Sequence, residues 1–89
     1  MRHYNVTIKG RVQGVTFRWS TKQKALGLHL FGFVQNEPDG SVYMEVEGQE
    51  EDLEEFLGWC HRGPLFSKVK DLKFEESNLK GYNTFEIKT

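Results

Sequence analysis

The stretch VYMEVEGQEEDLEEFLGWC, residues 42–60, changes its hydrophobic period part-way along, and this change decides the fold. In its first part apolar and polar residues alternate, which is the period of two of a strand with one buried face. In its second part the apolar residues recur at the i, i+3, i+4 and i+7 spacing of a helix, namely Leu53, Phe56, Leu57 and Cys60. Acidic residues crowd positions 50–55, where a helix dipole favours negative charge, and Gly63-Pro64 ends the helix. The sequence therefore predicts a strand followed by a helix.

The residues that open the chain predict a strand, a loop and a first helix. Tyr4, Val6 and Ile8 alternate with polar residues, and the segment Gly10–Gly14 then breaks the alternation as a loop would. A helix over residues 17–28 would place four residues on one buried face: Phe17, Thr21, Ala25 and Leu28. Gly27 lies near the expected end of this helix, where glycine is favoured.

The middle and the end of the chain predict three more strands. The apolar segment Leu30–Asn36 and the turn signal at residues 37–40 form a hairpin with the strand that starts at Val42. The segment Val69–Phe74 alternates imperfectly, since Val69 is out of phase with the apolar residues that follow, and a bulge would explain this. A polar loop over residues 77–83 leads to a short last strand that contains Phe85 and Ile87.

The resulting order is β-α-β-β-α-β with a short additional strand at the C-terminus. This is the split βαβ, or ferredoxin-like, arrangement of the α+β class. It predicts an antiparallel sheet with both helices on one face. The length of 89 residues fits one domain, over residues 1–89.

Composition narrows the functions that this domain could perform. Twelve basic and 13 acidic residues give a net charge of −1, which argues against a dedicated nucleic-acid-binding protein. The single cysteine cannot form an internal disulfide, which favours a reducing compartment. No apolar run reaches the length of a membrane span, and no signal-peptide pattern is present. We therefore expect a soluble, cytoplasmic protein. We also expect a monomer, because one continuous apolar pattern accounts for the core.

The segment Gly10–Arg18, GRVQGVTFR, is the strongest candidate for a binding loop. Its glycines permit tight turns, and the helix that follows contributes unpaired N–H groups at its first turn. Arg18 adds a planar cation suited to phosphate oxygens. The segment lacks the Gly-Lys-Ser/Thr ending of a Walker A motif, and no cysteine precedes the arginine as in cysteine phosphatases. The alternative interpretation is a tight loop with a surface arginine.

Asn36 is the second candidate, at the end of a predicted strand. An asparagine there is often only a turn former. Its amide could instead hold a water molecule, because it offers both donor and acceptor groups.

Both segments resemble the motifs of the acylphosphatase family. Gly10–Arg18 is similar to the signature loop of that family, and Gly32–Asn36, followed by Asp39–Val42, is similar to its second motif. Gly63-Pro64 and the terminal Phe85–Ile87 also match. The second motif of the family reads Gly-Trp-Val-Arg-Asn, so that this chain departs from it at Phe33 and Gln35.

The resemblance implies the hydrolysis of acyl phosphates to a carboxylate and inorganic phosphate, with no metal ion and no cofactor. Arg18 and the backbone N–H groups from about Val15 to Arg18 would bind the phosphoryl group, and Asn36 would position the attacking water. Gln13 and Gly14 would shape the loop. The implied phosphate-binding loop is thus Gln13, Gly14, Val15, Thr16, Phe17 and Arg18.

The remaining functional side chains are expected to be structural or exposed. His3, His29 and His61 lack metal-ligand spacing, and Cys60 lies on the apolar stripe of its helix. Arg11 is expected at the surface, and Trp19 either packs or lines the mouth of the pocket. Glu45 and Glu47 are expected on a polar strand face.

Two alternatives from other classes remain. RNA-recognition modules share the element order, but the third strand offers them only one aromatic residue, Tyr43, and two acids. A non-catalytic acylphosphatase-like domain would bind phosphate or a partner without turnover.

Overall fold

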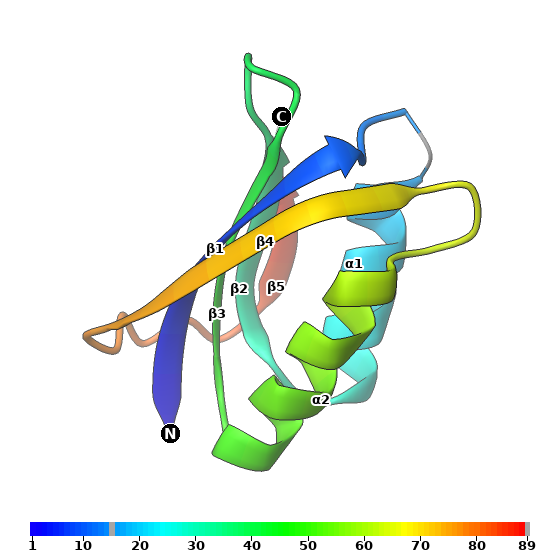
Figure 1. Ribbon diagram of the computed structural model, residues 1–89. Coiled ribbons are helices and arrows are strands. Elements are labelled where there is room, and N and C mark those ends of the chain that lie inside the picture. Colours follow the sequence, from blue (N-terminus) through cyan, green and yellow to red (C-terminus); the bar gives the residue numbers. More distant parts are fainter. Residues whose placement is uncertain (15, 89) are drawn as a thin grey trace.

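A five-stranded sheet with the strand order β4-β1-β3-β2-β5 carries both helices on one face (Figure 1). The computed structural model describes residues 1–14 and 16–88. The elements are β1 (Arg2–Arg11), α1 (Phe17–Gly27), β2 (Phe31–Asn36), β3 (Val42–Gly48), α2 (Glu50–Arg62), β4 (Lys68–Ser77) and β5 (Phe85–Lys88). No helix in the described part of the chain is long and apolar enough to cross a membrane. The predicted α+β, ferredoxin-like arrangement is confirmed.

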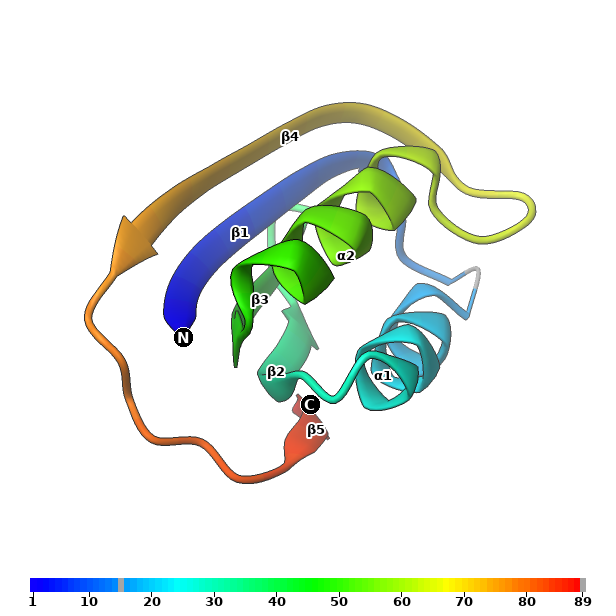
Figure 2. The same ribbon diagram turned by 90° about the horizontal axis from the view of Figure 1, so that it is seen from below.

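The sheet is mixed, which corrects the expectation of a wholly antiparallel sheet. The pairs β1–β4, β1–β3 and β2–β3 are antiparallel, whereas β5 runs parallel to β2. The connection between β4 and β5 stays at the lower end of the sheet in Figure 1 and leads from one edge of the sheet to the other (Figure 2). The chain therefore reverses its direction between these two strands, and β5 runs in the same direction as β2.

The first strand is longer than the sequence predicts. We expected a loop from Gly10 to Gly14, but β1 continues to Arg11 because Gly10 and Arg11 still pair with β4. The pairing shifts register after Lys9, so that Lys70 is an extra residue on β4. This confirms the predicted bulge, and it returns Val69 to the helix-covered face, where it packs against the core.

The core lies between the sheet and the two helices. The apolar stripe of α2 is fully buried as predicted, since Leu53, Phe56, Leu57 and Cys60 all belong to the core. On α1 the buried residues are Phe17, Thr21 and Ala25, and the helix ends one residue before the predicted Leu28. Burial raises the pKa of the Cys60 thiol, as expected for a packed rather than a reactive cysteine.

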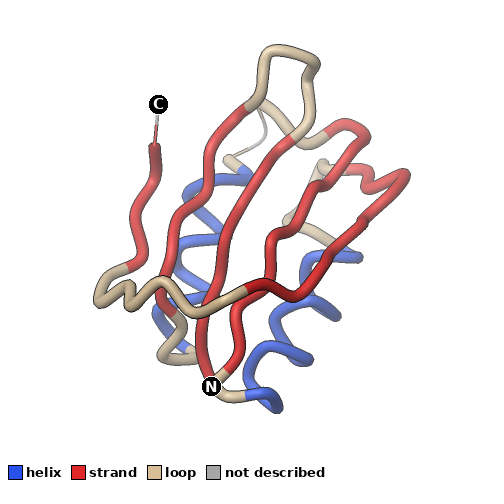
Figure 3. The backbone as a smooth tube through the Cα atoms, turned by 90° about the vertical axis from the view of Figure 1, so that its left-hand side faces the viewer, coloured by secondary structure: helices blue, strands red, loops and turns tan. Residues whose placement is uncertain are grey.

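The other face of the sheet is partly covered by the connection 78–84, which crosses it (Figure 3). Glu47 is only 2% exposed there, which corrects its expected place on a polar face. Its carboxylate accepts hydrogen bonds from the backbone N–H groups of Lys80, Gly81 (3.1 Å) and Tyr82 (3.2 Å). It also lies 2.7 Å from the ring of the fully buried His3.

The ionisation of Glu47 is fixed by these contacts. Burial raises the pKa of its carboxyl group, but the N–H groups of Lys80 and Tyr82 and the ring of His3 outweigh this and hold the pKa below its ordinary value. Glu47 is therefore a buried anion that ties the connection 78–84 to β3. This structural role of His3 agrees with the sequence analysis.

Candidate active site

A pocket of about 200 Å³ lies where the start of α1 meets the ends of β2 and β5. This volume corresponds to the space of roughly six or seven water molecules. The described residues that line it are Val12, Gly14, Thr16, Phe17, Arg18, Trp19, Asn36 and Ile87. None of these described lining residues is acidic, so the fixed charge of the pocket comes from Arg18.

The approach to α1 turns sharply, as an anion-binding loop requires. Gly14 and Thr16 both adopt left-handed backbone conformations, with φ of 75° and 59°. Glycine adopts this backbone conformation without strain, whereas a residue with a side chain, such as Thr16, adopts it less readily. Loops that contain such residues aim successive N–H groups to one side and form concave anion sites. Val15, which we also predicted in this loop, lies outside the described residues.

The first turn of α1 faces the same pocket. Among the described residues, the helical hydrogen bonds begin with the N–H of Ser20, which donates to the carbonyl oxygen of Thr16 at 2.9 Å. The N–H groups of residues 17–19 precede this ladder, and a helix presents such groups with the positive end of its dipole. The first turn contains no acidic residue. It can therefore take up a negatively charged ligand.

Arg18 is the second residue of α1 and is half-buried at the pocket. Its Nη1 atom donates to the carbonyl oxygen of Lys88 on β5 at 3.3 Å. One nitrogen of the guanidinium is thus held by the last strand. The other donors of the planar fork are able to meet phosphate oxygens.

Asn36 is the last residue of β2 and lines the pocket from the side of the sheet. Its Oδ1 atom is buried, yet none of the described residues gives it a hydrogen bond. An unsatisfied buried amide oxygen carries a free-energy cost of about 1–3 kcal/mol. A water molecule bound to this oxygen would satisfy the acceptor.

Gln13 does not line the pocket, but it links the loop before α1 to the turn between β2 and β3. Its Nε2 atom donates to the carbonyl oxygens of Glu37 at 2.9 Å and Ser41 at 2.8 Å. Both acceptors belong to the turn between β2 and β3, next to Asn36. Gln13 therefore fixes the distance between the loop before α1 and the strand that carries Asn36.

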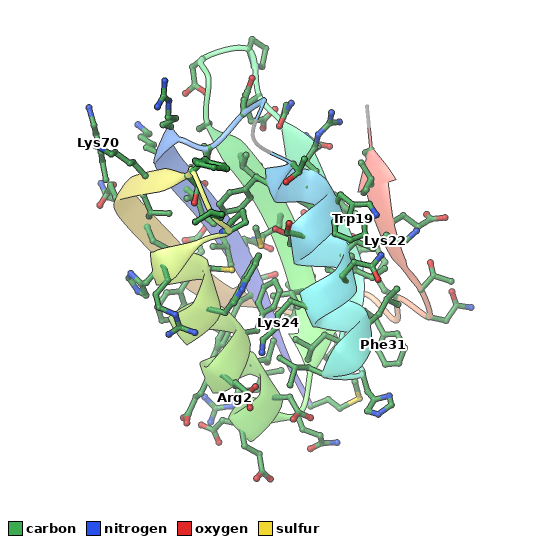
Figure 4. All side chains as sticks on the ribbon, turned by 90° about the vertical axis from the view of Figure 1, so that its right-hand side faces the viewer. Arg2, Trp19, Lys22, Lys24, Phe31 and Lys70 are labelled. Atoms are coloured by element: carbon green, nitrogen blue, oxygen red, sulfur yellow. The ribbon has the colours of Figure 1, made fainter. Side chains whose placement is uncertain are left out.

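Three residues of the pocket were missed or left open by the sequence analysis. Val12 is buried at the loop entrance, and Ile87 reaches the pocket from β5. Trp19 is 61% exposed and projects from α1 on the side of β5, which places it at the mouth of the pocket (Figure 4). The alternation around Ile87 predicted its strand, but no signal in the sequence gives the strand's partner.

The two departures from the family motif lie on the opposite face of the sheet. Phe33 packs its ring against those of Tyr43 and Tyr82, with the Lys88 ammonium 3.9 Å from its centre. Gln35 donates to the Glu37 carboxylate at 3.3 Å. Neither residue lines the pocket.

No group of three or more histidine, cysteine, aspartate or glutamate side chains is arranged to hold a metal ion in residues 1–14 and 16–88. Arg11 is exposed at the end of β1, as expected. The residues that the structure brings together are thus Gly14, Thr16, Phe17, Arg18 and Asn36.

Known proteins share both the sequence and the fold. The sequence model of the Acylphosphatase family matches residues 4–87. An acylphosphatase of Trichormus variabilis is 44% identical over 84 residues, which cover 94% of this chain and 83% of that protein. The crystal structure of acylphosphatase from Bacillus subtilis superposes with a TM-score of 0.98 at 39% identity and full coverage of both chains. A full-length HypF structure, phosphate- and nucleotide-bound, is 31% identical with a TM-score of 0.89, over 99% of this chain and 12% of that one. Matched along nearly its whole length, this chain belongs to the acylphosphatase family.

Proposed function

We propose that this chain hydrolyses acyl phosphates in the pocket at the start of α1, with Arg18 and loop N–H groups on the phosphoryl group and Asn36 on the attacking water. The observation that carries this proposal is that Asn36 lines one pocket with Arg18 and the first turn of α1, while none of the described residues donates a hydrogen bond to its buried Oδ1. Asn36 and the proposed anion site thus line the same small volume.

The chemistry of the substrate explains why so few groups suffice. The leaving group of an acyl phosphate is a carboxylate, whose conjugate acid has a pKa of about 4. Such a group departs at neutral pH without being protonated, so that no general acid is needed. The pocket has to bind, orient and stabilise charge.

Binding and charge stabilisation fall to Arg18 and the N–H groups. Phosphoryl transfer passes through a loose transition state with charge on the equatorial oxygens. Donors that are already in place can hold these oxygens without reorganising. The bond from Arg18 to Lys88 and the bracing of the loop by Gln13 support this preorganisation.

Positioning of the nucleophile falls to Asn36. Its Oδ1 would accept one O–H of a water molecule, which leaves a lone pair of that water free to point at phosphorus. The attacking and leaving oxygens lie roughly in line in this reaction. Holding water on this line converts a bimolecular encounter into a positioned attack.

Hydrolysis of benzoyl phosphate by the purified protein, followed spectroscopically, tests the proposal directly. We expect turnover, and we expect a chelator to leave the rate unchanged. A protein that bound inorganic phosphate but showed no turnover would instead be the non-catalytic alternative.

We further propose that the protein acts as a monomeric single domain over residues 1–89 in the cytoplasm and does not bind nucleic acid. The surface of β3 that would stack bases in an RNA-recognition module supports the last point. There the hydroxyl of Tyr43 donates to Glu45 at 2.8 Å, and Glu47 lies beneath the connection 78–84. Salt-sensitive binding of RNA would contradict it.

A further inference from the structure

We call the pocket at the start of α1 the phosphoryl pocket. A second hollow adjoins it on the side of the connection between α2 and β4. Its volume is about 540 Å³, which is within the range of small-molecule sites. We call it the Leu65–Phe66 groove, and its lining residues are Gly14, Thr16, Ser20, Pro64, Leu65 and Phe66. Gly14 and Thr16 also line the phosphoryl pocket, so the two hollows are neighbours on either side of these residues.

One wall of the groove consists of apolar side chains that do not pack into the core. The side chains of Leu65 and Phe66 are 79% and 76% exposed, and neither belongs to the core cluster. Large adjoining apolar side chains that remain exposed commonly mark a binding surface. Here they stand beside the loop that binds the phosphoryl group in the proposed function.

The turn that presents these side chains is held in place. The N–H and the hydroxyl of Ser67 both donate to the carbonyl oxygen of Pro64, at 3.1 Å and 2.6 Å. The turn also rests against α1, because a Cβ on Gly63 would lie 3.1 Å from the ring of Phe17. The wall of the groove is thus fixed relative to the phosphoryl pocket.

Phe66 adopts a backbone conformation that suits glycine. It is the third residue of the Pro64–Ser67 turn and has a φ of 74°. Turns with a positive φ at this position favour glycine, and a bulky residue there is strained. Strained residues that are kept in the left-handed region cluster at functional sites. The exposed position of the phenyl group therefore carries a conformational cost. Exposure to solvent does not offset this cost, whereas contact with a ligand would.

The direction of the reaction leads into this groove. In an in-line displacement the leaving group departs on the side of phosphorus opposite to the attacking water. Asn36 lines the phosphoryl pocket but not the groove. Asn36 and the segment Pro64–Phe66 approach Gly14 and Thr16 through different hollows, the first through the phosphoryl pocket and the second through the groove. A leaving group opposite Asn36 would point toward Leu65 and Phe66.

We infer that the Leu65–Phe66 groove binds the acyl group of the substrate and favours acyl phosphates whose acyl group is aromatic or otherwise bulky and apolar. This inference rests on the proposed function of the phosphoryl pocket. Arg18 and the loop before α1 would then bind the phosphoryl group of the substrate, and the turn after α2 would bind its acyl group.

The test compares acetyl phosphate, whose acyl group is too small to reach far into the groove, with benzoyl phosphate. The variants are Phe66→Gly and the double substitution Leu65→Ser, Phe66→Gly. Glycine at position 66 fits the positive φ, so these variants keep the turn. The control is Leu79→Ser, which removes a 54% exposed leucine from the connection 78–84.

We expect the ratio of kcat/KM for benzoyl phosphate to that for acetyl phosphate to fall about tenfold in the double variant, since apolar pockets discriminate acyl size to this extent. Turnover of acetyl phosphate and inhibition by inorganic phosphate should be unchanged, as should all values for the control. An unchanged ratio, or an equal loss with both substrates, would overturn the inference while the proposed function stands. If the unaltered protein hydrolyses neither compound, the proposed function itself fails.

Discussion

The connection 78–84 binds an anion with backbone N–H groups, and in the proposed function the loop before α1 does the same, but the two differ in where the anion comes from. In the connection, the N–H groups of residues 80–82 are taken by the carboxylate of Glu47 from the same chain. At the loop, none of the described residues that line the pocket carries a carboxylate, and the charge there is that of Arg18. In the proposed function the chain thus uses the same kind of anion site twice. One site is filled by Glu47 and contributes to stability, and the other, at the start of α1, is open for a ligand; we call them the filled site and the open site.

The difference also shows what the open site should do to its ligand. In the filled site, N–H donors together with His3 lower the pKa of Glu47 despite its burial. They therefore favour the charged form of the bound group. The same kind of donors around a phosphoryl group would favour the extra charge on its oxygens in the transition state.

Removing the fixed charge from the open site should have the largest effect. We expect Arg18→Ala to lower kcat/KM for benzoyl phosphate about 1000-fold, the upper range for loss of a transition-state donor. Competitive inhibition by inorganic phosphate should weaken at the same time, because the guanidinium binds the product too. Arg62→Ala, at the exposed end of α2, is the matched control and should retain full activity. Near-normal turnover by Arg18→Ala would show that the open site is not built around this charge.

Removing the water acceptor should have the next largest effect and separate positioning from anion binding. We expect Asn36→Ala to lower kcat about 100-fold, with little change in the inhibition constant of inorganic phosphate. The neighbouring Gln35→Ala changes a side chain on the other face of the sheet and should behave as the unaltered protein does. If Asn36→Ala lost phosphate inhibition instead of kcat, Asn36 would belong to the anion site.

A carboxylate placed at the open site should make it resemble the filled one. We expect Trp19→Glu to weaken phosphate inhibition about tenfold, since the new charge would lie in the first turn of α1 and repel the ligand. Trp19→Gln removes the same indole without adding charge, so that the difference between the two variants isolates the electrostatic effect. Equal inhibition of both variants would show that the pocket tolerates an anion of its own.

Emptying the filled site should have the smallest effect on turnover and a clear effect on stability. Because the pKa of Glu47 is lower in the folded than in the unfolded chain, its contribution is complete above the ordinary value of 4.5 and is lost as the pH falls through the folded value. We expect Glu47→Gln to lower the free energy of unfolding by about 1–3 kcal/mol at pH 7. The difference from the unaltered protein should shrink below about pH 4.5.

Urea denaturation at pH 7 and at pH 3.5 measures this effect, with Glu54→Gln on the exposed side of α2 as the control. Turnover of benzoyl phosphate at pH 7 should be unchanged in both variants. A large loss of turnover in Glu47→Gln would mean that the two anion sites are coupled through the sheet.

Hydrophobic periodicity predicted the elements well because burial is what it measures. The four-residue stripe of α2 is buried as expected, and the phase error at Val69 marked the bulge that follows Lys9 in the pairing of β1 with β4. Periodicity gives the face on which a residue lies but not what else covers that face. Glu47 was therefore expected in solvent, although the connection 78–84 buries it.

The candidate site was predictable where one short segment contains the chemistry. Gly14, Thr16, Phe17 and Arg18 lie in one loop and the helix start that follows it, and Asn36 stands in a second motif. The lining by Ile87 depends on the parallel pairing of β5 with β2, which no local pattern specifies. The apolar turn at Leu65 and Phe66 had no signal either, since exposed hydrophobic residues in a loop look alike in sequence whether or not a pocket adjoins them.

The complete burial of Cys60 gives this protein a built-in reporter of opening. It is the chain's one thiol, it lies on the face of α2 that is pressed against the sheet, and its pKa is raised by desolvation. A thiol reagent should modify it only when α2 separates from the sheet. The labelling rate therefore measures how often this local opening occurs. Measured with and without inorganic phosphate, this rate would show how strongly a ligand bound at α1 suppresses the opening of α2.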